Sequence, residues 1–283
     1  MTKLRDKMKE QMLLRNMAPG TQFQYLRAVI NLALHYNRCP SKLTEQEIRA
    51  FLVYVIKQKH YSPSTYNVML HGLKFFYQAV LGNKILTLEL PRMKESQKLP
   101  DVLSSQEIEQ IIKATRNIKH RTILILIYGA GLRAFEAGSL RVGDIDRDRR
   151  CIHIRDGKGR KDRYVPLSPI MLNALRDYWK ACRSRDTKTD NPLIFPGSSG
   201  SALSNVSIGA IYTRAKRQVG IQKQGGVHAL RHAFATHSLE AGADLYAIQQ
   251  ILGHASMSST VRYLRMTDKT LQMIQSPVER LNL

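Results

Sequence analysis

The chain has 283 residues, of which 43% are hydrophobic, and this is enough to fill the cores of two domains. No apolar run reaches the roughly 18 residues of a membrane span, and the charged first 14 residues lack the apolar centre of a signal peptide, so we expect a cytoplasmic protein that does not bind a membrane. Lys and Arg number 44 against 22 acidic residues, and the resulting net charge of +22 indicates a polyanionic partner such as DNA or RNA.

This positive charge is spread over the chain. Residues 1–100 hold 16 basic and 6 acidic side chains, and the remaining residues hold 28 and 16. We therefore expect both halves to contact the polyanion. Charge alone is also compatible with a ribosomal or merely very soluble protein, because it carries no information on chemistry.

Residues 1–90 show helical periodicity and few strand signals, which predicts a small helical domain of four helices. Apolar residues recur at three or four positions, as at Phe23, Leu26, Ile30 and Leu34. Turn and cap residues mark helix starts at 19–21, 41–44 and 62–64. The last helix, over 65–81, places one apolar face at Tyr66, Leu70, Leu73 and Phe76 or Tyr77.

Residues 91–102 form a polar stretch with two prolines, which predicts an extended linker between the two domains. Its several cations indicate that this linker lies along the phosphates of the polyanion. In residues 103–283 a helix is predicted from Ser104, and a second, over 121–130, is apolar nearly all round and should lie at the centre of the domain. Residues 151–155 and 163–167 alternate around a basic, glycine-rich turn, which predicts a β-hairpin. A helix near 172–182, a short strand at 193–195, a turn at 197–201 and further helices complete a mainly α fold with a small antiparallel sheet.

Several residues of the second domain could take part in catalysis, but each also has an ordinary structural explanation. Arg133 and Glu136, after the glycines at 129 and 131, could be a surface pair contributing only about 0.2–0.5 kcal/mol. Lys158 in the hairpin turn could be a solvated cation. Tyr263, with Val261 and Leu264 close by in the sequence, could be a core residue, and Tyr246 is a second candidate tyrosine.

Metal ligands are not indicated by the pattern. His228 and His232 lie one helical turn apart, as two zinc ligands would, but the segment lacks a carboxylate at the metalloprotease spacing. The three cysteines, Cys39, Cys151 and Cys182, form no Cys-x-x-Cys pair. We therefore expect no metal site.

Taken together, these residues supply what phosphodiester transfer needs without a metal. Arginines such as Arg133 and Arg231 donate bidentate hydrogen bonds to phosphate and stay charged. The Lys158 ammonium could protonate the leaving sugar oxygen. A tyrosine hydroxyl must lose its proton as it attacks, which requires an acceptor such as His228, and Tyr263 would then be the nucleophile.

In order and spacing these residues resemble the tyrosine site-specific recombinases, the lambda-integrase and Xer group, over nearly the whole chain. The shared motifs are Gly131-Leu132-Arg133 with Glu136, the hairpin Lys158, His228-Ala229-Leu230-Arg231, and Leu252-Gly253-His254 followed by Tyr263. Departures from the common pattern include Gly138, which would weaken a helix by about 1 kcal/mol relative to alanine, and the flanking Arg262 and Arg265.

The resemblance implies a helical core-binding (SAM-like) domain at 1–90, a linker at 91–102 and an α+β catalytic domain at 103–283. It further implies a site-specific recombinase that cuts and rejoins double-stranded DNA through a 3′-phosphotyrosine, exchanging strands through a Holliday junction without metal or nucleotide cofactor. Arg133 and Arg231 would bind the scissile phosphate, Lys158 would protonate the leaving oxygen, and His228 would assist proton transfer. His254 would hydrogen-bond a phosphate oxygen, and Glu136 would support the site.

The same resemblance implies a homotetramer on DNA, with or without a second recombinase, in which the C-terminal segment 267–283 docks on a neighbouring subunit. The two domains would form a clamp around the duplex. Integration, excision, resolution and transposition all remain open as biological roles. Two other functions also remain open, namely a noncatalytic DNA-binding protein on the same scaffold and a type IB topoisomerase.

Overall fold

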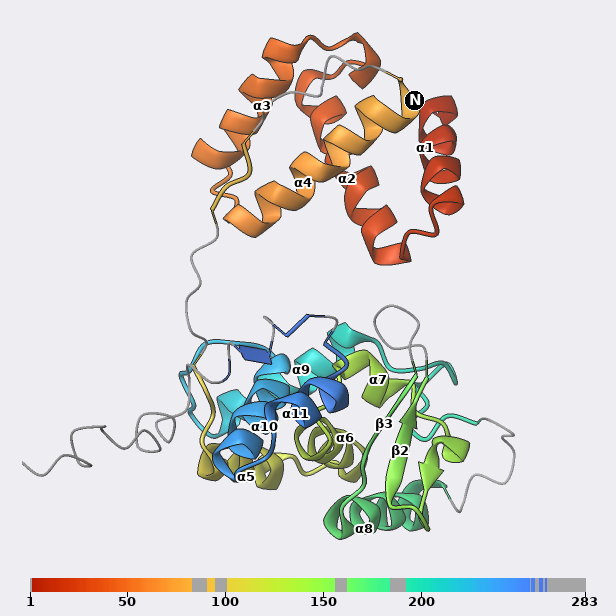
Figure 1. Ribbon diagram of the computed structural model, residues 1–283, viewed down its shortest axis with the longest axis vertical. Helices are drawn as coiled ribbons and strands as arrows, with labels where there is room; N and C mark the ends of the chain where they lie inside the picture. The colour runs from red at the N-terminus through yellow and green to blue at the C-terminus, as the bar shows by residue number, and fades with distance from the viewer. Residues whose placement is uncertain are drawn as a thin grey trace, which may run out of the picture. The chain divides into compact units, whose positions relative to one another are not determined.

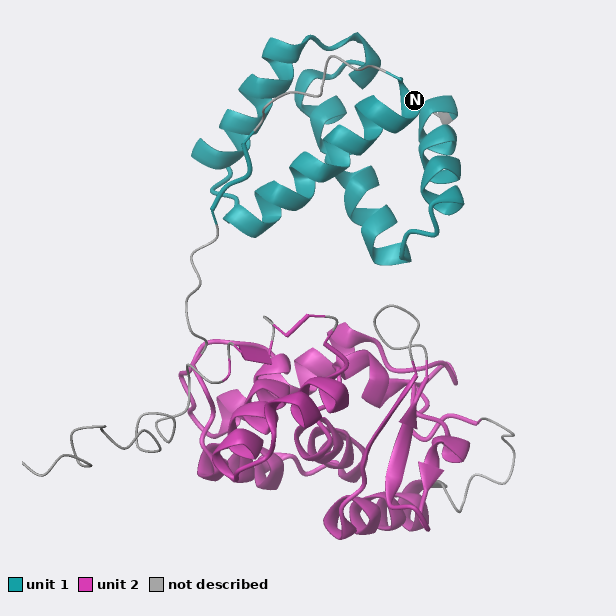
Figure 2. Cartoon of the chain, in the orientation of Figure 1, with its two compact units in different colours: residues 1–97 teal, residues 98–283 magenta. Residues whose placement is uncertain are grey.

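The computed structural model describes residues 2–82, 91–94, 101–155, 162–183, 192–254, 256–257, 260–261 and 263 (Figure 1). The chain divides into two compact units, residues 1–97 and residues 98–283 (Figure 2). Helices dominate both units, and the second also contains a three-stranded antiparallel sheet. The predicted fold class is therefore confirmed.

The described part of unit 1 consists of four α-helices, α1 (Thr2–Leu14), α2 (Pro19–Tyr36), α3 (Glu45–Lys57) and α4 (Pro63–Phe75). Helix α3 begins at a capping box in which Thr44 and Glu47 satisfy each other's backbone N–H groups. Helix α4 begins at the Ser62 cap and continues as a π-helical turn over Phe76–Val80. Its predicted apolar face is confirmed, because Tyr66, Leu70, Leu73, Phe76 and Tyr77 are all buried.

Helix α2 is oriented differently from what the largest apolar residues suggest. Its buried residues are Ala28, Val29, Leu32 and Ala33, whereas Phe23 is 62% exposed and Leu34 is 68% exposed. A Cβ on Gly72 of α4 would lie 3.0 Å from the Tyr25 Cα and 3.1 Å from the Ala28 Cβ. The two helices therefore cross at small residues, and this close approach decides which face of α2 is buried.

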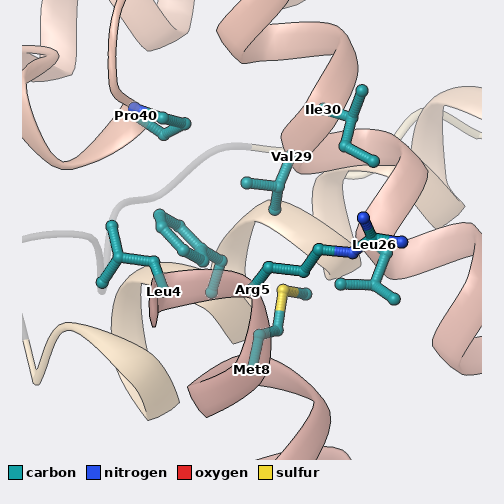
Figure 3. A pocket seen from close by; sticks show the side chains of 8 residues that line it. Leu4, Arg5, Met8, Leu26, Val29, Ile30 and Pro40 are labelled. Carbon is teal, nitrogen blue, oxygen red and sulfur yellow. The ribbon is translucent and has the colours of Figure 1, made fainter. Parts of the chain in front are cut away.

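An apolar pocket lies between α1 and α2. Figure 3 shows Leu4 and Met8 of α1 facing Leu26 and Val29 of α2, with Pro40 at its edge. The packing of α1 against α2 therefore leaves an apolar space beside the core of unit 1.

Unit 2 is built around α6 (Ile118–Gly129), whose Ile123, Leu124, Leu126 and Ile127 are buried, as the sequence predicted. This helix contacts α5 (Ser105–Ala114), α7 (Ala134–Gly138), α8 (Pro169–Tyr178), α9 (Asn205–Gln218) and α10 (His228–Glu240). Helix α11 (Leu245–Leu252) lies beside α10. Figure 1 shows the sheet at the edge of this helical assembly.

The sheet has the order β1 (Ile145–Asp146), β2 (Cys151–Ile154), β3 (Arg163–Pro166). The predicted hairpin is confirmed, since β2 and β3 pair antiparallel, with Ile154 opposite Arg163 at the end of the ladder. The predicted strand at 193–195 is wrong: Leu193 makes only an isolated bridge to Arg141. The segment 193–195 lies beside residues 140–142, which are not a strand. The Ile194 N–H donates to the Leu140 carbonyl at 2.8 Å, but the pairing does not extend into a regular ladder.

Candidate active site

Arg133 lies where the chain leaves α6 and enters α7. Gly131 has φ +62°, and a Cβ there would lie 2.5 Å from Phe234 and 2.9 Å from Leu252, so both conformation and space require glycine. The Arg133 backbone N–H donates to Glu136 Oε2 at 2.8 Å, and its guanidinium donates to Oε1 at 2.7 Å. Glu136 is only 8% exposed, so the interpretation as a surface pair is wrong.

Glu136 also binds Arg163 of β3. The two terminal nitrogens of Arg163 donate to Oε1 and Oε2 of Glu136 at 2.9 Å and 2.7 Å, a bidentate arrangement. Burial alone would raise the pKa of Glu136, but the hydrogen bonds and charge of Arg163 and Arg133 lower it to about 2. Glu136 is therefore an ionised carboxylate at pH 7, held between two cations.

Arg231 is the third guanidinium of the cluster. It donates to the Gly131 carbonyl at 2.6 Å and to the Leu252 carbonyl, and it lies 3.9 Å from Glu136 Oε2. Burial and the charge of Arg133 lower the pKa of Arg231 to about 9, against the opposing effect of Glu136. The side chain is nevertheless still protonated at pH 7. Because a guanidinium has five N–H donors, these carbonyl contacts leave donors for a phosphate.

The C-terminal end of α11 gathers all three arginines. The carbonyls of Ile251, Leu252 and Gly253 accept hydrogen bonds from Arg163, Arg231 and Arg133 respectively. The last carbonyls of a helix have no partner within the helix and carry the negative end of its dipole. Ile251 and the first two residues of the Leu252-Gly253-His254 motif thus position the cationic cluster, and the motif also supplies a histidine.

Tyr263 lies next to this helix end and is only 3% exposed. Its ring is nearly parallel to that of His254, with centroids 6.2 Å apart, and its hydroxyl lies 2.9 Å from His232 Nδ1. His254 is oriented by Thr260, whose hydroxyl lies 2.9 Å from His254 Nδ1. Tyr263 therefore packs in a small apolar cluster while its oxygen contacts an ionisable group.

His228 is the first residue of α10, one turn before Arg231, and its side chain is exposed. Partial desolvation and the charges of Arg231 and Arg133 lower the pKa of His228, which favours the neutral, proton-accepting ring at pH 7. The competing tyrosine, Tyr246, is 60% exposed near the start of α11. Lys158, Arg262, Arg265 and the segment 267–283 lie outside the described residues.

Three residues of this site were missed at the level of sequence: Arg163, His232 as a partner of the tyrosine, and Thr260. Arg163 did have a readable signal, because it shares a strand face with the buried Val165, so its side chain turns inward. His232 and Thr260 lack such a pattern, because their contacts depend on where Tyr263 and His254 lie.

Among the described residues, no group of three or more His, Cys, Asp or Glu side chains is placed to hold a metal ion. The described helices also include none that is long and apolar enough to cross a membrane.

Comparisons with known proteins agree with this geometry. Residues 101–270 match the phage integrase family, and residues 4–87 match the N-terminal SAM-like domain of phage integrases. The y4qK protein of Sinorhizobium fredii is 38% identical over 283 residues, covering 99% of this chain and 90% of its own. The tyrosine recombinase XerA of Pyrococcus horikoshii is 32% identical over 222 residues, covering 77% and 74%.

A lambda integrase dimer bound to a core site has the same fold, with a TM-score of 0.72 at 16% identity, covering 98% of this chain and 99% of its own. The family match spans most of the sequence and includes every motif assembled around α11. The chain therefore belongs to the phage integrase family and is a tyrosine recombinase, an enzyme that breaks and rejoins DNA at specific sites.

Proposed function

We propose that Tyr263 attacks the scissile phosphate, forms a 3′-phosphotyrosine and releases a 5′-hydroxyl. Arg133 and Arg231 bind the phosphate and stabilise the charge that its oxygens gain in the transition state. His254, whose ring is oriented by the contact of Nδ1 with Thr260, donates a hydrogen bond to a phosphate oxygen. Glu136 keeps the arginines in place, and His228 assists proton transfer.

The observation that carries this proposal is the convergence of Arg133, Arg231, His254 and Tyr263 at one end of α11. They come from four separate segments of the chain. Among the described residues, three guanidinium groups are opposed by a single carboxylate. A purely structural cluster would not need this arrangement, which leaves positive charge for an anion.

Lys158 is proposed as the acid that protonates the leaving oxygen. The residues that flank its turn are held by two side-chain pairs: Arg155 forms an ion pair with Asp144 at 2.6 Å, and His153 Nε2 lies 2.9 Å from Asp162 Oδ2. These pairs support a defined starting point for the turn between β2 and β3. A lysine there is on the same sheet as Arg163, which contacts Glu136.

DNA is also proposed to contact unit 1. A groove on α2 and the start of α4 is lined by polar side chains that suit phosphate, including Gln24, Arg27, Asn31, Ser64 and Thr65. It shares Arg27, Asn31 and Tyr61 with an adjoining groove that extends to Lys59. This supports binding of one duplex by both units.

We further propose that the enzyme acts as a homotetramer on two DNA sites in the bacterial cytoplasm, exchanging strands through a Holliday junction, with residues 267–283 docking on a neighbouring subunit. The lambda integrase structure supports DNA-bound assembly, since that protein is a dimer on its core site. Neither metal nor nucleotide is assigned a role, because attack, charge stabilisation and proton transfer all have candidate side chains.

The test begins by finding the target. Fragmented DNA from the source cell is incubated with the protein, covalent adducts are collected under denaturing conditions, and the attached DNA is sequenced. A duplex carrying the recovered sequence, with a nick beside the cleavage position, should then trap the adduct. Tyr263→Phe should abolish trapping, whereas Tyr246→Phe should retain it.

Other outcomes identify the alternatives. Specific DNA binding without any adduct would favour a noncatalytic protein. Relaxation of plasmids regardless of sequence would favour a type IB topoisomerase. Loss of the adduct in Tyr246→Phe rather than in Tyr263→Phe would identify Tyr246 as the nucleophile.

A further inference from the structure

We propose that His232 is a further catalytic residue, which takes the hydroxyl proton of Tyr263 through Nδ1 as the tyrosine attacks. This inference rests on the proposed role of Tyr263 as the nucleophile. His232 belongs to α10 and directly follows Arg231, so the residue that would accept the proton is adjacent to one that would bind the phosphate.

The geometry favours proton transfer between these two side chains. The Tyr263 hydroxyl lies 2.9 Å from His232 Nδ1, within the range expected for a general base and its proton donor. The ring centroids are 5.7 Å apart at an angle of 47°, so the histidine meets the tyrosine at its oxygen rather than stacking on its face. Tyr263 is nearly inaccessible to solvent, so a proton acceptor within the protein is needed.

The two histidines of α10 can therefore act at different places. His228, at the exposed start of the helix, is under the influence of Arg231 and Arg133. His232, one turn further on and partly buried, contacts the tyrosine. A neutral imidazole with its proton on Nε2 presents Nδ1 as an acceptor, which is the state that this step requires.

The step balances as follows. The bond from Tyr263 Oη to phosphorus forms, the bond from phosphorus to the 5′ oxygen breaks, the hydroxyl proton moves to His232 Nδ1, and a separate acid, proposed to be Lys158, protonates the leaving oxygen. Free tyrosine has a pKa of about 10 and free histidine about 6.5, so transfer before attack is unfavourable by a factor of roughly 3000. Transfer that accompanies bond formation avoids this cost, and rejoining returns the same proton to Tyr263.

The test combines one substitution with two substrates. His232→Asn keeps a polar atom near the Nδ1 position but cannot take up a proton. The substrates are nicked duplexes with oxygen or sulfur as the 5′ leaving atom, because a thiolate leaves without an acid. We expect His232→Asn to slow adduct formation about 100-fold or more on both substrates, whereas Lys158→Ala should be slow on oxygen and restored on sulfur.

A matched control lies on the same helix. His237 Nδ1 is 3.0 Å from the Tyr128 hydroxyl, so His237→Asn makes the same chemical change at a second histidine–tyrosine pair. His237→Asn should cleave at the wild-type rate. Thermal unfolding and DNA binding of both variants separate loss of chemistry from loss of folding.

Wild-type rates for His232→Asn on both substrates would overturn the inference. Faster cleavage would overturn it as well and would mean that His232 holds Tyr263 in a resting position. Recovery of His232→Asn on the sulfur substrate would assign His232 to the leaving group instead. An adduct formed by Tyr263→Phe would refute the proposed function itself, a result distinct from these.

Discussion

Glu136 shows how a single residue can organise a cationic site. Its two oxygens bind Arg133 and Arg163, and Arg231 lies 3.9 Å away. In the part of the site that the structure describes, one negative charge holds three guanidinium groups together without neutralising them. The remaining positive charge suits a phosphate, and the carbonyl ends of α11 limit the repulsion until DNA arrives.

The contribution of the ionised Glu136 carboxylate to stability should depend on pH. Its pKa falls from 4.5 to about 2 in the folded protein, so the ionised carboxylate contributes stability that is present above about pH 5 and is lost as the pH falls toward 2. This shift corresponds to about 3 kcal/mol. Glu136→Gln should therefore unfold more easily than wild type at pH 7, and the difference should shrink between pH 5 and 2. Urea denaturation at several pH values measures it, and a constant difference would contradict the assignment.

Replacing Arg163 even by lysine should slow the enzyme. The three hydrogen bonds of Arg163 join Glu136 to the Ile251 carbonyl, and a lysine ammonium cannot reproduce this planar, bidentate pattern. We expect Arg163→Lys to reduce the rate of adduct formation at least about tenfold, because Glu136 and the end of α11 would shift relative to Arg133. The exposed Arg147 provides the control, since Arg147→Lys should cleave normally. If Arg163→Lys formed the adduct as fast as Arg147→Lys, Arg163 would have no role in positioning the site.

At the scale of elements, α7 illustrates a conflict between local preference and packing. Gly138 ends this short helix, where alanine would be the better helix former by about 1 kcal/mol. A Cβ at Gly138 would, however, lie 2.6 Å from the Leu203 carbonyl oxygen and 3.0 Å from Ile208. The close approach of α7 to the start of α9 therefore requires glycine.

Two matched substitutions should have opposite signs. Gly138→Ala forces a shift of backbone and should lower the free energy of unfolding by about 1–3 kcal/mol. Gly209→Ala, within α9 and with no atom within 4 Å of the added Cβ, should raise it by about 0.5–1 kcal/mol. Thermal and chemical denaturation of the two variants measure both effects. Stabilisation by both would show that α7 can move away from α9.

The sequence was sufficient to predict elements with a clear local pattern, such as the nearly all-apolar α6 and the alternating strands of the β2–β3 hairpin. It was not sufficient where contacts between distant residues decide which face of an element is buried or whether a strand forms. The buried face of α2 depends on a crossing with Gly72, and the two-residue strand β1 exists only because it pairs with β2. The motifs that meet at the end of α11 could be recognised from their order in the sequence. Spacing alone, however, could not pair Arg163 with Ile251, which lies 88 positions further along the chain.

At the scale of the whole molecule, the positive charge of both units is the property that matters for DNA. Unit 1 presents Arg27 and Lys59 along its grooves, and unit 2 holds the arginine cluster. A recombinase must hold its site through cleavage and rejoining, because release of a cut strand would leave a broken chromosome. Binding by both units, as proposed above, would supply many phosphate contacts and so keep the cut DNA bound.

Salt should therefore weaken DNA binding steeply. Each neutralised phosphate of duplex DNA contributes about −0.9 to the slope of log K against log salt, so simultaneous binding by both units should give a slope steeper than about −5. Arg27→Gln should remove about one unit of that slope and weaken binding to any sequence similarly, because a phosphate contact carries no base information. Fluorescence anisotropy of a labelled duplex between about 50 and 200 mM salt measures both quantities. A nearly flat plot for the full chain would contradict binding by two units, and an unchanged slope for Arg27→Gln would place the DNA elsewhere on unit 1.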